Sequence, residues 1–287
     1  IYWMTGCACH NIAALSGILA RVETVHGIKT GLVRDMAARP GSAGETAVTK
    51  PQTNRLYQTS TMAALLDAVY DGETTLDEVL QHGNFGLGTF NALDGEMIVT
   101  DGVARQFRAE GVAAQVPGSL KTPFACVTYF EPEQSVTIDR PLDKAGFEAE
   151  VDRLVGNPNL FAAVRFTGQF ERVDTRTVFC QCHPYPPMLE VVKKQPTFTM
   201  DSVSGTMVGF RTPAYMQGVN VAGYHVHFLT EDRTRGGHVT EYKVTRGLLE
   251  VATISDIDIR LPRTKQFAQA NLSPEHLHEA IRVAEGG

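Results

Sequence analysis

Gly223-Tyr-His-Val-His-Phe228 is the stretch that decides how the second half of the chain folds. Its apolar residues alternate with His225 and His227, and a period of two residues predicts a β-strand. One face of that strand would be apolar and the other would carry both imidazoles. Because residues i and i+2 of a strand lie on the same face, the two histidines could contact one common partner.

A third histidine, His238, follows Arg235-Gly-Gly237 and extends the pattern. If residues 229–237 connect two paired strands, three imidazoles could bind one ion at the roughly 2.0–2.1 Å of zinc–nitrogen bonds. Three protein ligands leave a coordination position open, which suits catalysis better than a structural role. For any single one of the nine histidines, an ordinary half-buried strand position is the simpler interpretation. For the triple we favour a metal site.

The bulk composition narrows the classes of protein. The chain has 287 residues, of which 43% are hydrophobic, so it can bury a core in one large or two modest domains. Its net charge of −6 gives no basic footprint, which argues against a nucleic-acid partner. No apolar run approaches the roughly 18 residues of a membrane span. We therefore expect neither nucleic acid nor a membrane as a partner.

The cysteines and the first residues bear on the cellular location. The five cysteines are few and odd in number, which argues against a disulfide framework and for a reducing compartment. Residues 1–55 begin at Ile1 and lack a basic region followed by an apolar stretch and a cleavage-like site. A secretory signal is therefore not supported, and we expect a cytoplasmic location. We treat residues 1–55 as an appendage whose structure the pattern does not predict.

Helical and strand signals are mixed over residues 56–157, where strands are predicted over 96–100 and 126–130, and strand signals prevail after that. Ser60 and Thr75 each precede a short helical pattern, and a longer helix is predicted over 143–155, ending at Gly156. Later strands are predicted over 161–166, 173–181, 207–210, 224–229, 238–244 and 248–254. We expect an α+β fold. Residues 56–157 would form a mixed β-sheet N-terminal domain with helices, and residues 158–287 a strand-rich, barrel-like, metal-binding domain with a C-terminal tail.

Charged residues on the predicted strands are further site candidates. Arg176 lies in phase with apolar neighbours and needs an anionic partner, because burying a guanidinium alone is costly. The partner could be Asp174 or another carboxylate, or it could be the carboxylate of a substrate, bound by both arms of the guanidinium. Arg165 competes for the same role. Glu96 and Glu285 would ordinarily be solvated carboxylates.

Glu231 gives a second interpretation of the histidine motif. With His225 and His227 it forms His-x-His-x3-Glu, which resembles the metal motif of cupin barrels. Gly218 lies one residue too far upstream for that motif, His238 comes too early and no second cupin motif follows. A cupin-like metal enzyme or a small-ligand-binding barrel is therefore the alternative interpretation.

A longer set of segments resembles the alpha-acetolactate decarboxylase family. The segments follow one another from Tyr57 to Glu285 in the order of that family, and such a collinear set is more specific than three histidines alone. Residues 1–55 are not required by the family pattern. The matching segments are Tyr57-Gln-Thr-Ser-Thr-Met62, Asn84-Phe-Gly-Leu-Gly-Thr-Phe90, Leu93-Asp-Gly-Glu96, Thr122-Pro-Phe124, Thr175-Arg-Thr177, Gly209-Phe-Arg-Thr-Pro-Ala-Tyr215, Gly223-Tyr-His-Val-His-Phe228 and Gly236-Gly-His238.

The resemblance implies a site, a reaction and an assembly. It favours Arg176 over Arg165 as the residue that binds a substrate carboxylate, and it gives two glutamates roles that composition does not indicate. The implied reaction converts 2-acetolactate, a small 2-hydroxy-3-keto acid, to acetoin and carbon dioxide, in a homodimer. The implied site is a zinc ion on His225, His227 and His238, with Glu96, Arg176 and Glu285 around it and Thr89 nearby.

Overall fold

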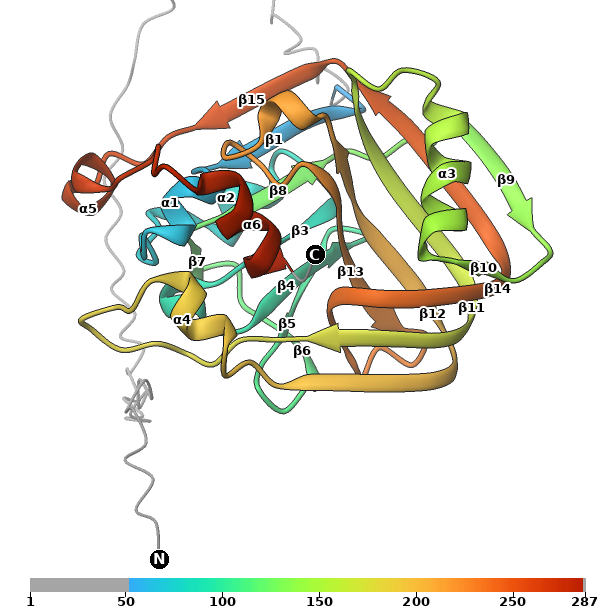
Figure 1. Ribbon diagram of the computed structural model, residues 1–287, viewed down its shortest axis with the longest axis horizontal. Helices are drawn as coiled ribbons and strands as arrows, with labels where there is room; N and C mark the ends of the chain where they lie inside the picture. Colours follow the sequence, from blue (N-terminus) through green and yellow to red (C-terminus); the bar gives the residue numbers. More distant parts are fainter. Residues whose placement is uncertain (1–51, 286–287) are drawn as a thin grey trace, which may run out of the picture. The chain divides into compact units, whose positions relative to one another are not determined.

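The histidine stretch forms strand β13 (Gly223–Thr230), which pairs along its length with β12 (Thr197–Thr212). The chain then turns back into β14 (Gly236–Ile254), so a short connection joins two paired strands, as the spacing of the histidines predicts. These strands belong to a computed structural model that describes residues 52–285 (Figure 1). Nearly all of the predicted appendage, residues 1–55, lies outside the described residues.

Seven strands form the first sheet. All neighbours in it are antiparallel except β1 and β15, which run parallel. Because β15 comes from the C-terminal part of the chain, the sheet unites segments that lie far apart in the sequence. In spatial order its strands are β15 (Asp256–Arg260), β1 (Arg55–Thr59), β8 (Ala125–Thr128), β3 (Phe85–Thr89), β4 (Glu96–Thr100), β5 (Val103–Phe107) and β6 (Ala113–Gln115).

The second sheet contains the histidine strands. Its order is β10 (Leu142–Asp143), β14, β11 (Phe161–Arg176), β12 and β13, with β9 (Gln134–Ile138) also paired to β14. β13 pairs with β14 over three residues, next to their connection. The mixed α+β class is confirmed, but the predicted barrel is wrong, because the two sheets do not form a closed barrel. Each face of the second sheet is instead covered by other elements, so its apolar side chains are buried without closure of the sheet into a barrel.

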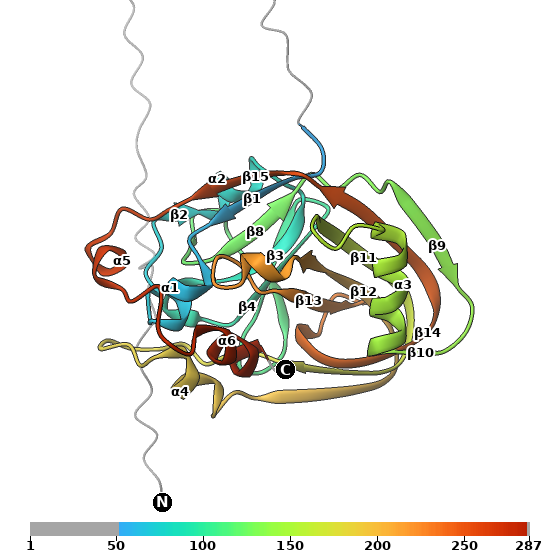
Figure 2. The ribbon, with the colours of Figure 1, turned by 45° about the horizontal axis from the view of Figure 1, so that its top comes forward.

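An apolar core lies between the two sheets. The first sheet contributes side chains such as Leu87 and Ile98, and the second contributes Ala163 and Phe210. Three short helices complete this core, namely α1 (Met62–Leu66), α4 (Met188–Val192) and α6 (Leu277–Glu285). The three helices contact one another and gather at one end of the core (Figure 1, Figure 2).

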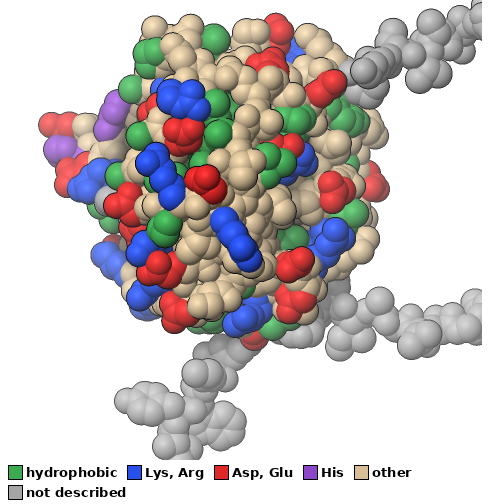
Figure 3. Space-filling model, turned by 90° about the vertical axis from the view of Figure 1, so that its right-hand side faces the viewer, with side chains coloured by type: hydrophobic (Ala, Val, Ile, Leu, Met, Phe, Trp, Pro, Cys, Tyr) green, Lys and Arg blue, Asp and Glu red, His purple; other side chains and the backbone are tan. Residues whose placement is uncertain are grey.

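A longer helix covers the outer face of the second sheet. It is α3 (Lys144–Val155), which begins after the capping side chain of Asp143 and ends at Gly156, whose φ of 64° suits glycine. Its buried stripe, which includes Phe147 and Val151, packs on this face as the sequence predicts. The exposed surface on that side shows acidic and basic side chains interspersed (Figure 3). Pairs there such as Arg153–Glu150, at 2.6 Å, are worth only about 0–1 kcal/mol, so burial holds α3 in place.

The shorter elements correct two details of the sequence prediction. Thr75 caps α2 (Leu76–Leu80) through the predicted capping box. The cap of α1 is Thr61 rather than Ser60. The helix stops at Leu66, because Ala68 adopts a φ of 63°, which an α-helix does not allow. The remaining elements are the pair β2 (Thr74–Thr75) and β7 (Lys121–Thr122), helix α5 (Lys265–Gln269), and the single turns η1 (Asn91–Leu93) and η2 (Ala214–Met216).

Two further expectations concern cysteines and membranes. Cys126 is a free, buried cysteine, whereas Cys182 is disulfide-bonded, so the cysteine count by itself does not support a reducing compartment. Within residues 52–285, no helix is long and apolar enough to cross a membrane.

The core under α3 should dominate the stability of the second sheet. Phe166 is fully buried and makes edge contacts with the rings of Phe147 and Phe170. We expect Phe166→Ala to lower the free energy of unfolding by about 3–5 kcal/mol, because it removes this packing and leaves a cavity. Urea denaturation measures the change. Phe179→Ala is the matched control, since that ring is 47% exposed. Equal losses in the two variants would contradict this account of the core.

Candidate metal centre

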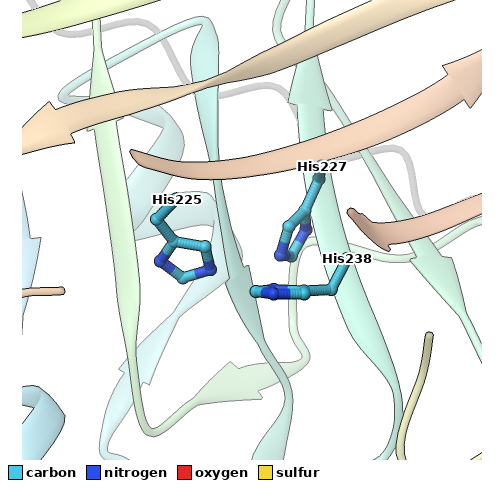
Figure 4. A group of neighbouring side chains, drawn as sticks. All are labelled: His225, His227 and His238. Carbon is cyan, nitrogen blue, oxygen red and sulfur yellow. The ribbon is translucent and has the colours of Figure 1, made fainter. Parts of the chain in front are cut away.

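Two of the three histidines lie in one row across the second sheet, and the third lies beside them on the same face. His227 of β13 pairs with His238 of β14, and His238 pairs in turn with Arg176 of β11. His225 lies two residues along β13 on the same face. The imidazole centroids are 5.0–5.3 Å apart, and the nitrogen atoms available as ligands lie within 4.8 Å of one another. The rings converge from two strands (Figure 4), as the sequence predicts.

A β-bulge in β14 allows His238 to face this row. Neighbouring residues of β11 pair with Glu241 and Val239, so Thr240 is an extra residue in β14. As a result Val239 and Tyr242 both pack into the core under α3, although residues three apart point to opposite faces of a regular strand. The bulge therefore turns His238 toward the interior between the sheets while the next part of β14 keeps its apolar face on α3.

The hydrogen bonds of the imidazoles leave nitrogens available for an ion. His227 Nδ1 lies 2.7 Å from the backbone oxygen of Met97 and can only donate to it, which leaves Nε2 as a bare acceptor. His227 Nε2 and His225 Nδ1 are buried without a hydrogen-bond partner. Buried nitrogens without partners are costly, and a metal ion would satisfy them. Of the groups of histidine, cysteine, aspartate and glutamate among residues 52–285, this triad is the one with metal-ligand spacing.

Burial also fixes the protonation of the triad. It lowers the pKa of His225 to about 3, and the positive charge of Arg176 contributes in the same direction. Burial likewise lowers the pKa of His227 and of His238 well below its ordinary value. The three rings are therefore neutral at neutral pH, and neutral imidazole is the form that binds metals.

Two carboxylates from different elements border the same space. Glu96 comes from β4 of the first sheet, and its Oε2 lies 3.7 Å from His227 Nε2. Glu285 comes from the last turn of α6, and its Oε2 lies 3.5 Å from His225 Nε2 and 3.7 Å from His238 Nε2. These separations are longer than direct hydrogen bonds. The set of neutral imidazoles and carboxylate oxygens is one that zinc accepts as ligands.

Burial raises the pKa of both carboxyl groups. The pKa of Glu96 rises to about 7, because desolvation outweighs the opposing effect of Arg176, and the charge of Glu285 adds to the rise. The pKa of Glu285 is also raised by burial, again against the effect of Arg176. A pKa of about 7 lets Glu96 carry a proton near neutral pH, which is what a general acid requires, and the pKa of Glu285 is shifted in the same direction.

Arg176 lies fully buried beside the histidines. Its Nη1 donates to Gln195 Oε1 at 3.0 Å and its Nη2 donates to the backbone oxygen of Ala284 at 2.7 Å. Each terminal nitrogen is also 3.8 Å from a carboxylate, Nη1 from Glu96 and Nη2 from Glu285. The Nε–H has no hydrogen-bond partner. The guanidinium therefore faces the same space as the metal-ligating atoms.

Two carboxylates on the strands pair with arginines other than Arg176. Asp174, the first structural partner considered for Arg176, instead pairs with Arg172 at 3.0 Å. Arg165 makes a two-armed ion pair with Glu250, with a shortest contact of 2.7 Å. Arg165 is therefore committed to a structural pair, and Arg176 is the arginine at the histidines.

Thr89 and a set of apolar side chains complete a small cavity at the site. Thr89 of β3 pairs with Glu96 across the first sheet, and its hydroxyl donates to the backbone oxygen of Gly95 at 2.7 Å. The same cavity is lined by His225, His238, Glu96, Arg176 and Glu285, and by apolar residues of α1, α4 and neighbouring segments. The seven residues predicted for the site therefore lie close to one another in the structure.

Other contributors had no signal in the sequence. Gln195 and the backbone oxygens of Met97 and Ala284 hold side chains of the site, but a glutamine or a backbone carbonyl carries no recognisable motif. Glu231, the ligand expected for a cupin-like site, is exposed and lies outside the histidine group. That geometry removes the main support for the cupin-like interpretation.

Comparison with known proteins agrees with this geometry. The family model described as alpha-acetolactate decarboxylase matches residues 56–274. The chain belongs to the alpha-acetolactate decarboxylase family. An alpha-acetolactate decarboxylase of Klebsiella aerogenes is 46% identical over 230 residues, which cover 80% of this chain and 88% of that relative. One of Bacillus subtilis is 43% identical over 233 residues, covering 81% and 91%. The chain is therefore a decarboxylase, a carboxy-lyase.

Solved structures of the family share the fold. The crystal structure of alpha-acetolactate decarboxylase from Bacillus subtilis strain 168 matches with a TM-score of 0.80 at 43% identity, covering 81% of this chain and all of that chain. A Staphylococcus aureus protein described as similar to alpha-acetolactate decarboxylase matches with a TM-score of 0.78 at 30% identity, covering 81% of this chain and all of that one. The two-sheet architecture is thus that of the alpha-acetolactate decarboxylases.

Removing one imidazole should abolish metal binding without unfolding the chain. We expect His227→Ala to lose nearly all bound zinc, because two imidazoles cannot replace the three-ligand set. Zinc content by mass spectrometry and circular dichroism of the same sample measure the two properties. His183→Ala is the control, since the side chain of His183 is 67% exposed and pairs with Asp71. A folded His227→Ala variant with full zinc content would rule out the site.

Proposed function

We propose that the chain catalyses the zinc-dependent decarboxylation of 2-acetolactate to acetoin and carbon dioxide. The observation that carries the proposal is a group of three buried, neutral imidazoles beside a buried arginine and two carboxyl groups whose side chains are only 9% and 11% exposed. Family membership supports the substrate, and the group of imidazoles supports a metal. A homodimer, as the resemblance implies, and a cytoplasmic location are part of the same proposal.

His225, His227 and His238 would hold the zinc ion. When bound, the ion supplies a Lewis acid near the oxygen atoms of the substrate, where negative charge grows as carbon dioxide leaves. The backbone oxygen of Met97 fixes the tautomer and orientation of His227 through Nδ1. The other face of the triad is bordered by Glu96 and Glu285 rather than by a fourth imidazole.

Arg176 would bind the carboxylate that leaves. The guanidinium is planar and positive, and its Nε–H is free of other partners. Gln195 and the backbone oxygen of Ala284 hold its two terminal nitrogens in fixed directions. A carboxylate held in this way keeps the bond between its carbon and the neighbouring carbon oriented for cleavage, which lowers the entropy cost of the reaction.

One of the two carboxyl groups would supply the proton. When the carbon–carbon bond breaks, its electron pair stays with the remaining carbon fragment, and a proton must then reach one face of that fragment. Glu96 and Glu285 both lie beside the histidines, and burial raises the pKa of each. Delivery from one side fixes the handedness of the product.

A metal-storing or small-ligand-binding protein is the alternative function. Such a protein would need the three imidazoles but not a fully buried arginine with two buried carboxyl groups. Burying these charged groups is costly, and metal storage alone offers no gain that offsets the cost. The composition of the site therefore favours the decarboxylase.

Acetoin formation tests the proposed function directly. We expect the purified chain to convert racemic 2-acetolactate to acetoin, and a chelator to remove most of this activity. Added zinc should restore it, because the imidazoles remain in place between the sheets. Colorimetric detection of acetoin measures the rate. Full activity in a sample shown to be metal-free would contradict zinc dependence.

A conservative change at Arg176 tests the carboxylate role. We expect Arg176→Lys to reduce kcat/KM for 2-acetolactate by about 100-fold, because an ammonium group cannot reproduce the planar two-armed contact and leaves the substrate misplaced. Arg165→Lys is the matched control, since its partner is Glu250. The chemical denaturation midpoint checks folding in both variants. Wild-type kinetics in Arg176→Lys would show that Arg176 does not hold the carboxylate.

A further inference from the structure

The cavity at the site has an apolar wall in addition to its polar groups. All six side chains of the wall are at most 5% exposed. They come from segments far apart in the sequence, including α1 and α4, and they face the space bordered by the histidines and Arg176. The six residues are Met62, Leu65, Leu93, Phe124, Val178 and Met188.

We infer that Met62 and Met188 determine which alkyl groups the substrate can carry. The inference rests on the proposed function, because 2-acetolactate combines a polar half with two methyl groups. Its carboxylate would bind Arg176, and its hydroxyl and ketone oxygens would suit the metal ion that the three histidines would hold. The methyl groups are then left to the apolar wall, where their burial removes apolar surface from water.

The two methionines are the adjustable part of this wall. Methionine is unbranched and has three rotatable side-chain bonds, so it fills irregular space and yields to a bound group. Val178 is branched at Cβ and stiff, and Phe124 is a flat ring with few rotamers. The side-chain lengths of Met62 and Met188 therefore mainly determine whether a substrate with one more methylene group fits the cavity.

The backbone of Met62 is fixed, so its side chain alone sets the local shape. The backbone N–H of Met62 donates to the backbone oxygen of Val219 at 3.1 Å. Thr61 caps α1, accepting a hydrogen bond from the backbone N–H of Ala64 at 3.2 Å. Shortening Met62 should therefore enlarge the cavity rather than shift the helix.

Met188 is held in the same manner at the start of α4. The hydroxyl of Tyr70 donates to the backbone oxygen of Pro186 at 3.0 Å. The backbone N–H of Glu190 donates to the backbone oxygen of Pro187 at 2.9 Å. Contacts of α4 with α1 and α6 enclose this turn. The side chain of Met188 is 5% exposed, so the space that it leaves on truncation opens into the cavity rather than to solvent.

Substrate homologues test the inference. The substrates are 2-acetolactate and two homologues, one with ethyl in place of the methyl at C2 and one with ethyl in place of the methyl on the ketone. We expect Met62→Ala and Met188→Ala each to raise kcat/KM for at least one ethyl homologue, relative to 2-acetolactate, by about 10-fold, the usual effect of one methylene in an apolar pocket. Met207→Ala is the matched control, because Met207 is 1% exposed but lies in the core under α3.

Each outcome distinguishes this inference from the proposed function. If the wild-type chain does not decarboxylate 2-acetolactate, the proposed function fails. If it does, the deciding quantity is kcat/KM for the ethyl homologues relative to 2-acetolactate. No change in this ratio in a folded methionine variant overturns the role of that methionine. An equal rise of the ratio in Met207→Ala overturns the role of the wall. Met62→Val and Met188→Val leave smaller cavities and should shift the ratio in the same direction if an alanine variant does not fold.

Discussion

The structure depends on keeping a small set of polar groups dry between two sheets. Three neutral imidazoles, a guanidinium and two carboxyl groups lie next to a large apolar core. Such groups are expensive to bury unless each finds a partner. Several remain unsatisfied in the bare protein, among them His225 Nδ1, His227 Nε2 and Glu285 Oε2. The cluster is therefore built for a ligand, which would satisfy these atoms.

The fold meets this demand by bringing the polar groups from opposite sides. The second sheet supplies the histidines and Arg176 on one face, and the first sheet supplies Glu96 and Thr89. Helix α6 closes the space with Glu285, while Ala284 of the same turn holds the guanidinium. Apolar side chains of α1 and α4 exclude water from the remaining side. A dry site strengthens every electrostatic interaction within it, and decarboxylation chemistry needs that strength.

Local signals predicted the local structure well. The capping box at Thr75 and the glycine stop of α3 are set by contacts within a few residues, so a short window of sequence contains their cause. Strand limits were less predictable. Segments predicted separately over 238–244 and 248–254 form one strand, β14, and the strand predicted over 173–181 ends at Arg176. These limits depend on pairing with strands that are distant in the sequence, and a short segment of sequence gives no information on those partner strands.

The sequence by itself determined the histidine face, because alternation along one strand is a local property and a tight connection placed His238 beside it. The family pattern added Glu96 and Glu285 and favoured Arg176 over Arg165, yet the sequence pattern alone suggested that both glutamates face solvent. Only the tertiary structure decided their burial, since Glu285 reaches the site through the docking of α6 and Glu96 through the packing of one sheet on the other. The tertiary structure also decided which face each side chain of β14 occupies. The bulge at Thr240 that sets these faces arises from the register with β11, a partner strand more than 60 residues away in the sequence.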